Sequence, residues 1–136
     1  MERLLSKLPV LAIMCVLFTF STCVDNIPVD NGLLEGTITI GPLCPVETDP
    51  PSPGCLPTAE TYKAYPVSIW TSDGSRKIAQ INPALDGSFG VVLAPGLYLI
   101  KLDKDNGIGS SNLPQTVVIS SLEKTVVSIS IDTGIR

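Results

Sequence analysis

The sequence predicts an all-β protein: an antiparallel, seven-stranded β-sandwich that an N-terminal signal helix precedes. Three observations support this fold class. Apolar and polar residues alternate in short segments from about residue 33 onward, residues that favour turns separate these segments, and no segment after residue 24 has a helical period. Antiparallel strands with one apolar face each bury those faces most simply when two sheets pack together.

The first 23 residues have the layout of a secretory signal peptide. Arg3 and Lys7 form a short charged head, an uncharged apolar run follows at 8–20, and small residues come directly before Cys23. The apolar run is shorter than the roughly 20 residues with which a helix spans a bilayer. We therefore expect an exported protein, with an uncleaved N-terminal anchor as the alternative.

The end of this segment, "FSTC", resembles the lipobox of bacterial lipoproteins, in which the cysteine becomes the lipidated first residue of the mature chain. Phe20 stands where that group prefers Leu, and Thr22 where it prefers Gly or Ala, so a plain secretory signal is the alternative. Lipidation of Cys23 would make the membrane a partner of the chain. Residues 24–32 are the expected linker, and 33–136 the expected sandwich domain.

The first two expected strands show the alternation well. The aliphatic face of the first strand, 33–40, consists of Leu34, Ile38 and Ile40. In the second strand, Val67 and Ile69 alternate with a serine and a tryptophan. Asp73 and Gly74 then supply a hairpin turn.

The remaining strands continue the same pattern. The return strand 76–82 ends at Pro83, which cannot donate a hydrogen bond to a central ladder. Pro95 and Gly96 predict a tight turn between the next two strands, and the last two strands are 115–120 and 125–132. The alternating positions expected to face the core in these strands include Phe89, Val91, Leu93, Tyr98, Ile100, Leu102, Val127, Ile129 and Ile131.

Composition argues against several functions. The formal net charge is −4 and no run of Lys and Arg occurs, so we expect no nucleic-acid partner. The chain has no histidine, the commonest general base and a common transition-metal ligand. No Ser-x-x-Lys or Gly-x-Ser-x-Gly motif occurs either. We expect no enzyme activity, no catalytic residues, no metal site and no cofactor.

The stretch "ALDGSFGVVLAPGLYLIKL" resembles the repeat of the carboxypeptidase regulatory-like and transthyretin-like domains, which are bacterial modules of the prealbumin-like sandwich fold. The residues that carry the resemblance are Asp86, Gly87, Phe89, Leu93, Pro95, Gly96, Tyr98 and Ile100. The resemblance covers about 33–132. It implies an appended structural or adhesive module, and it brings no catalytic residues with it.

The proline-rich loop 41–61 departs from the short connection that is usual in such domains after the first strand. Cys44 and Cys55 lie in it with ten residues between them, a spacing unlike that of zinc-binding pairs or of redox CxxC motifs. In an exported protein we therefore expect a structural disulfide between them. Its prolines remove further freedom from the unfolded loop.

Three aromatic residues are candidates for binding. Trp70 follows Ile69, so alternation turns it away from the core, where it could form a platform with Tyr62 and Tyr65 for a sugar or a partner protein. In the alternative interpretation, the stapled loop folds back over Trp70 and buries all three rings.

The segment "DKDNG" at 103–107 begins like a calcium-binding loop. Its glycine comes one position early, and no bidentate glutamate follows at the required distance. We interpret it as a solvated loop tip.

Together these features predict an exported, lipid-anchored, non-enzymatic module with a structural or binding role at the cell envelope, or a secreted one. The first alternative is a carbohydrate- or protein-binding module that uses Trp70, Tyr62 and Tyr65. The second is display of the rigid loop 44–55 in the manner of a protease inhibitor. An envelope protein or a glycan is the expected kind of partner.

Overall fold

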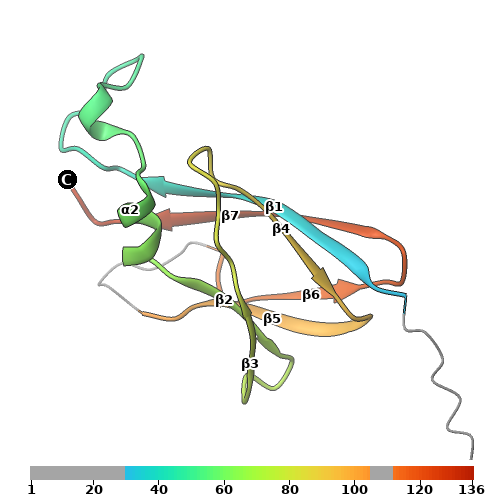
Figure 1. Cartoon of the computed structure of the whole chain (residues 1–136). Coiled ribbons are helices and arrows are strands. Elements are labelled where there is room, and N and C mark those ends of the chain that lie inside the picture. The colour runs from blue at the N-terminus through green and yellow to red at the C-terminus, as the bar shows by residue number, and fades with distance from the viewer. Residues whose placement is uncertain (1–29, 105–111) are drawn as a thin grey trace, which may run out of the picture.

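The computed structural model of the chain describes residues 30–104 and 112–136. Within them, seven strands form two sheets that pack face to face, which confirms the β-sandwich (Figure 1). The strands are β1 (Gly32–Gly41), β2 (Val67–Thr71), β3 (Lys77–Gln80), β4 (Ser88–Leu93), β5 (Gly96–Leu102), β6 (Gln115–Ile119) and β7 (Lys124–Asp132). One sheet has the order β4-β1-β7 and the other β3-β2-β5-β6. The expected signal helix lies outside the described residues.

The core forms between the two sheets from the side chains that alternation turns inward. Every strand except β3 contributes fully buried aliphatic or aromatic residues to it. The buried strand residues are Leu34, Ile38, Ile40, Val67, Ile69, Phe89, Leu93, Ile100, Val117, Ile119, Val127, Ile129 and Ile131. Val91, Tyr98 and Leu102 are partly buried and pack against this cluster. The predicted inward positions are therefore confirmed.

The first sheet contains a pairing that differs from the antiparallel arrangement we expected. β1 pairs antiparallel with β4, but it pairs parallel with β7, from Leu33 opposite Lys124 to Gly41 opposite Asp132. Alternation identifies which face of a strand is buried and says nothing about the direction of its neighbour. That direction depends on the path of the chain between the first and last strands.

The chain bends at Pro95, between β4 and β5, but this bend does not join two strands of one sheet. β4 pairs with β1 in the first sheet, whereas β5 pairs with β2 and β6 in the second. The chain therefore crosses from one sheet to the other at this bend. The turn at Asp73 and Gly74, in contrast, does close a hairpin between β2 and β3, and Gly74 there has a φ of 71°.

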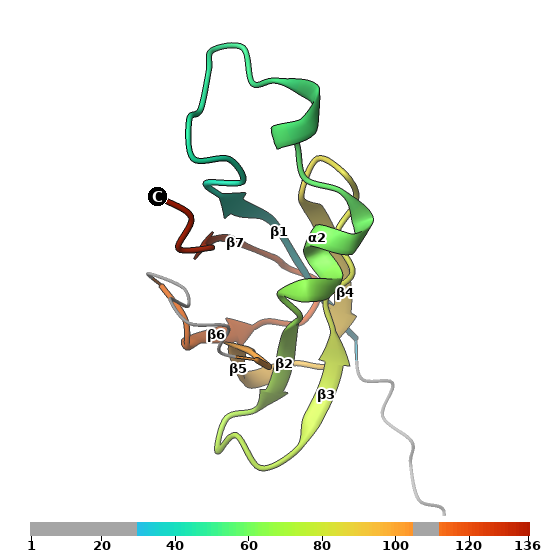
Figure 2. The ribbon, with the colours of Figure 1, turned by 90° about the vertical axis from the view of Figure 1, so that its left-hand side faces the viewer.

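A short helix that the sequence pattern did not predict, α2 (Ala59–Ala64), leads into β2. Thr58 caps it, because its side chain accepts the backbone N–H of Thr61 while the Thr61 side chain accepts the backbone N–H of Thr58. Figure 2 looks onto the end of the sandwich where this helix lies. Six residues are too few for a helical period to be visible in the sequence.

Gly87, in the turn before β4, explains the Asp-Gly pair of the family resemblance. Its φ is +83°, which glycine adopts without strain. A Cβ at this position would lie 2.2 Å from the carbonyl oxygen of Ile38 and 3.2 Å from the hydroxyl of Tyr62. The turn therefore packs directly on β1 and on α2, and only glycine leaves room for both contacts.

Candidate functional site

The predicted disulfide between Cys44 and Cys55 is present, with an S–S distance of 2.05 Å. The loop that contains it is shorter than the expected 41–61, because β1 extends to Gly41 and α2 begins at Ala59. We call residues 42–58 the stapled loop. It includes one short 3₁₀ helix, η1 (Pro53–Cys55).

Both ends of the stapled loop are attached to the sandwich. At its start, Leu43 packs against the core. The backbone N–H of Thr133 donates to the carbonyl of Gly41 at 3.2 Å, and the hydroxyl of Thr133 donates to the carbonyl of Pro42. At its end, the loop passes into α2, where the side chain of Tyr62 is buried in the core. The two ends are therefore held independently of the disulfide.

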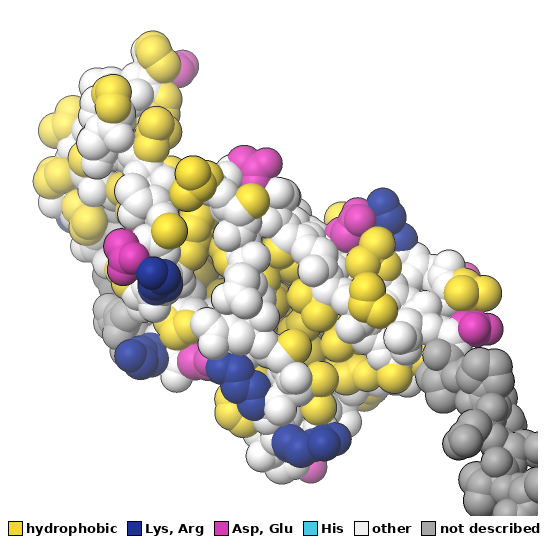
Figure 3. Space-filling view, viewed as in Figure 1, with side chains coloured by type: hydrophobic (Ala, Val, Ile, Leu, Met, Phe, Trp, Pro, Cys, Tyr) yellow, Lys and Arg dark blue, Asp and Glu magenta, His cyan; other side chains and the backbone are white. Residues whose placement is uncertain are grey.

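The middle of the stapled loop lies in solvent. All residues from 45 to 54 are exposed, and Val46 exposes 76% of its surface. Figures 1 and 2 show this segment extending beyond the end of the sandwich, and apolar side chains gather on it in Figure 3. Local hydrogen bonds, such as that from the Thr48 hydroxyl to the Pro50 carbonyl at 3.0 Å, add to the disulfide. Residues 45–54 of the stapled loop are therefore accessible from solvent.

Trp70 lies on the outward face of β2, as alternation predicted, and it is half-buried. The ammonium of Lys101 stands 3.7 Å from the centre of its ring, and its indole N–H donates to Asp103 Oδ1 at 3.4 Å. Lys101, from the neighbouring strand β5, therefore covers one face of the Trp70 ring. The interpretation that the stapled loop folds over Trp70 is wrong, because that loop extends away from the sheets.

The structure does not bring Tyr62, Tyr65 and Trp70 together as a platform. Tyr62 is 8% exposed and belongs to the core. Burial, and then the nearby charge of Asp86, raises the pKa of its hydroxyl. Tyr65 is partly buried against the same core. The prediction that Tyr62 offers a binding surface is therefore wrong, and Trp70 is the ring that faces outward.

Asp103 forms a polar cluster with residues of β2 and β3 that the sequence did not reveal. It accepts hydrogen bonds from the hydroxyl of Ser68 at 2.7 Å and from the ammonium of Lys77 at 2.6 Å. Burial by itself raises the pKa of Asp103, but the hydrogen bonds from Lys77 and Ser68 and the charge of Lys77 outweigh it, so the net shift is downward. Asp103 is exposed in a bend after β5, as the interpretation of 103–107 as a solvated loop tip predicted, but its carboxylate is engaged by side chains of β2 and β3. Residues 105–107 lie outside the described part.

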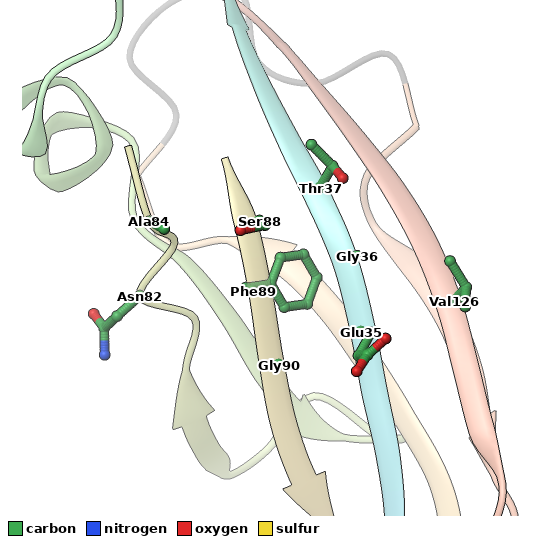
Figure 4. A pocket seen from close by; sticks show the side chains of 9 residues that line it. All are labelled: Glu35, Gly36, Thr37, Asn82, Ala84, Ser88, Phe89, Gly90 and Val126. Carbon is green, nitrogen blue, oxygen red and sulfur yellow. The ribbon is translucent and has the colours of Figure 1, made fainter. Parts of the chain in front are cut away.

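A shallow groove of about 630 Å³ crosses the first sheet (Figure 4). Two of its four polar side chains, Glu35 and Ser88, have charged partners. Glu35 pairs with Lys124 at 2.8 Å, and the hydroxyl of Ser88 donates to Asp86 at 2.6 Å. Neither hydroxyl of the groove, from Thr37 or Ser88, has a histidine to activate it, because the chain has none.

The described residues contain neither a candidate metal site nor a candidate membrane-spanning helix. No three His, Cys, Asp or Glu side chains in this part of the chain are close enough to hold a metal ion. No helix within the same residues is long and apolar enough to cross a membrane. The predicted signal peptide 1–23, the lipidation site Cys23 and the linker up to residue 29 lie outside the described residues.

No protein-family model and no curated protein matches the chain, so the likeness to carboxypeptidase regulatory-like domains stays a resemblance. Solved structures do match. GBS52, the minor pilin of Streptococcus agalactiae, has a TM-score of 0.52 at 15% identity over 76% of this chain and 44% of its own. A DUF3823 family protein from Parabacteroides merdae has a TM-score of 0.45 at 17% identity, over 76% of this chain and 46% of its own. The chain thus spans less than half the length of these two proteins. The match to GBS52 shows a shared β-sandwich fold.

Proposed function

We propose that this chain is an exported, lipid-anchored, non-enzymatic β-sandwich module that presents the stapled loop to a protein partner at the cell envelope. One observation carries the proposal: β1 connects the N-terminal linker, which we call the tether, to the stapled loop. The strand begins at Gly32, where the tether enters, and ends at Gly41, where the loop begins. A ten-residue strand is about 30 Å long. An anchor at Cys23 would therefore hold one end near the membrane and direct the loop away from it.

The compartment and the absence of catalysis are supported by separate observations. A disulfide persists in an oxidising compartment outside the cytoplasm, in agreement with the signal-like segment at the N-terminus. The non-enzymatic role is supported by the lack of histidine. It is also supported by the polar cluster around Asp103 and by the groove on the first sheet. In these two places the carboxylates of Asp103 and Glu35 are each paired with a lysine.

A protein is the favoured partner because of the chemistry of the loop. Residues 42–58 contain prolines, aliphatic residues and five polar side chains that can accept hydrogen bonds, but no aromatic ring on which a sugar could stack. A loop that is ordered before binding loses less conformational entropy when it binds. Inhibitor-like insertion into an enzyme cleft is a narrower form of the same proposal. Trp70 is a weaker candidate for binding a glycan, because Lys101 already covers one face of its ring.

A photo-crosslinking amino acid can test the loop in intact cells. We would place it at Val46, which is 76% exposed on the stapled loop, and for comparison at Val126, which is 68% exposed on the first sheet. The proposal predicts a discrete crosslinked protein at position 46 that is absent at position 126. Adducts at neither position, or at 126 alone, would contradict the role of the loop.

The intact mass of the membrane-extracted protein tests the anchor. Cleavage before Cys23, an added diacylglyceryl group, and a mass two hydrogens below that of the reduced chain are the expected results. A mature chain without lipid that is found outside the membrane fraction would contradict the anchor, although the display of the loop would not depend on it.

A further inference from the structure

The end of the sandwich opposite the stapled loop exposes a group of apolar side chains. Leu122, in the turn between β6 and β7, is 79% exposed, and Val92, near the end of β4, is 63% exposed. With Leu33 they line a hollow of about 410 Å³, together with Asn31 and Lys124. Figure 3 shows apolar and acidic side chains on this end of the molecule. Exposed aliphatic side chains that adjoin one another around a hollow form a candidate contact surface.

Leu122 has an unusual backbone conformation for its residue type. Its φ is 57°, in the left-handed region, and it is the one residue other than glycine with a positive φ in the described part of the chain. Glycine or asparagine occupies such positions at lower cost. Burial within the sandwich does not offset this cost, because the side chain of Leu122 is exposed.

The tether leaves the sandwich beside this group. The backbone N–H of Leu122 donates to the carbonyl of Asn31 at 3.1 Å, and Figure 1 shows the start of β1 and the β6–β7 turn together at one end. Eight residues along the chain separate Cys23 from Asn31. Even when fully extended they reach only about 28 Å. A lipid on Cys23 would therefore keep this end, and not the stapled loop, close to the bilayer.

We propose that Leu122, Val92 and Leu33 rest on the lipid surface and orient the anchored module with its stapled loop outward. This inference rests on the proposed lipid anchor. The contact is apolar in kind: Lys124 is paired with Glu35, and the neighbouring charged residues Asp30 and Glu123 are exposed acids. With no cluster of free cations at this end among the described residues, binding does not depend on anionic lipid.

The single tryptophan of the chain allows a direct test. In a Trp70→Phe background, the lipidated full-length mature protein receives one reporter: Leu122→Trp, Val92→Trp or, as a matched control at the other end, Val46→Trp. Each protein is reconstituted into phosphatidylcholine vesicles with or without brominated acyl chains, and in a parallel series with anionic phosphatidylglycerol added. Two reporters at the tether end keep the test valid if the Leu122→Trp protein does not fold.

The inference predicts that emission from the reporters at 122 and 92 shifts to the blue in vesicles and loses intensity with brominated lipid, while the reporter at 46 does neither. Equal behaviour of all three reporters, in protein that still floats with the vesicles, would overturn the contact and leave the anchor intact. A blue shift without quenching means that protein covers the surface, from the same chain or a second copy, and this too overturns it. Quenching that requires anionic lipid contradicts the apolar contact. If the protein does not float with the vesicles, both the proposed lipid anchor and this inference are contradicted.

Discussion

The stapled loop and the sandwich that carries it are ordered by different forces. The sandwich buries fifteen hydrophobic side chains in one cluster, whereas every residue from 45 to 54 of the loop is exposed. Burial of apolar surface therefore holds the sandwich. A covalent link, prolines and anchored ends hold the loop. The exposed segment 45–54 can therefore change in sequence without a cost to the core, as a surface that serves recognition requires.

Replacement of a glycine by alanine should give the largest difference in stability between a variant in the sandwich and one in the loop. Gly87→Ala places a Cβ 2.2 Å from the carbonyl oxygen of Ile38 at a φ of +83°, so we expect a loss of about 3–5 kcal/mol in the free energy of unfolding. Gly54→Ala, in the loop, meets no atom within 4 Å and should leave the midpoint of thermal unfolding almost unchanged. Similar midpoints for the two variants would refute the contrast.

Removal of the disulfide should affect the loop more than the sandwich. The link between Cys44 and Cys55, eleven residues apart, restricts the unfolded chain by about 3 kcal/mol in the loop-entropy description. The loop gains part of the same freedom in the folded protein, so we expect the Cys44→Ser/Cys55→Ser variant to lose about 1–3 kcal/mol. Limited proteolysis should then cut within 45–54 while the β-strands stay intact. Cuts that begin in the strands would contradict this picture.

The edge of β7 that faces away from β1 offers a smaller test of the sandwich. The side-chain amide of Asn112 donates to the carbonyl of Ser128 at 2.6 Å and accepts the N–H of Ser130 at 3.2 Å, as a neighbouring strand would. Asn112→Ala should cost about 1–2 kcal/mol and increase aggregation, because it uncovers a strand edge. Asn112→Asp keeps the acceptor and should lie between the two in urea unfolding. An alanine variant as stable and soluble as the parent would show that the amide is dispensable.

The smallest effect concerns the tip of the β2–β3 hairpin, which side-chain hydrogen bonds order. The Thr71 hydroxyl, followed by the N–H and hydroxyl of Ser75, lowers the pKa of Asp73 from 3.8 to about 2. Because the folded pKa lies below the unfolded one, this contribution is present above about pH 4 and is lost as the pH falls through about 2. A carboxyl titration by NMR should give a low midpoint that Thr71→Val raises. A midpoint near 3.8 in the parent would contradict the hydrogen bonds.

Much of the fold was predictable because its signals are local. Leu34, Ile38 and Ile40 indicated the buried face of β1 through their spacing alone, and the Asp73-Gly74 pair indicated the hairpin through its turn chemistry. Helix α2 gave no such signal, since only its capping threonine distinguishes it. The candidate site was harder to predict. Ser68 alternates with the core residues Val67 and Ile69, so no local signal indicated its burial. Asp103, 35 residues away, accepts its hydrogen bond.

Sequence alone determined the strand faces, the turns and the disulfide, because each depends on residues that are close along the chain or on the pairing of two cysteines. Tertiary structure decided the parallel pairing of β1 with β7, the place of Lys101 over Trp70, and the direction of the stapled loop. These features depend on contacts between segments that are far apart in the chain. The physical reason is that the period of a strand records which side is buried, whereas its neighbours are chosen by how the whole set of apolar faces packs together.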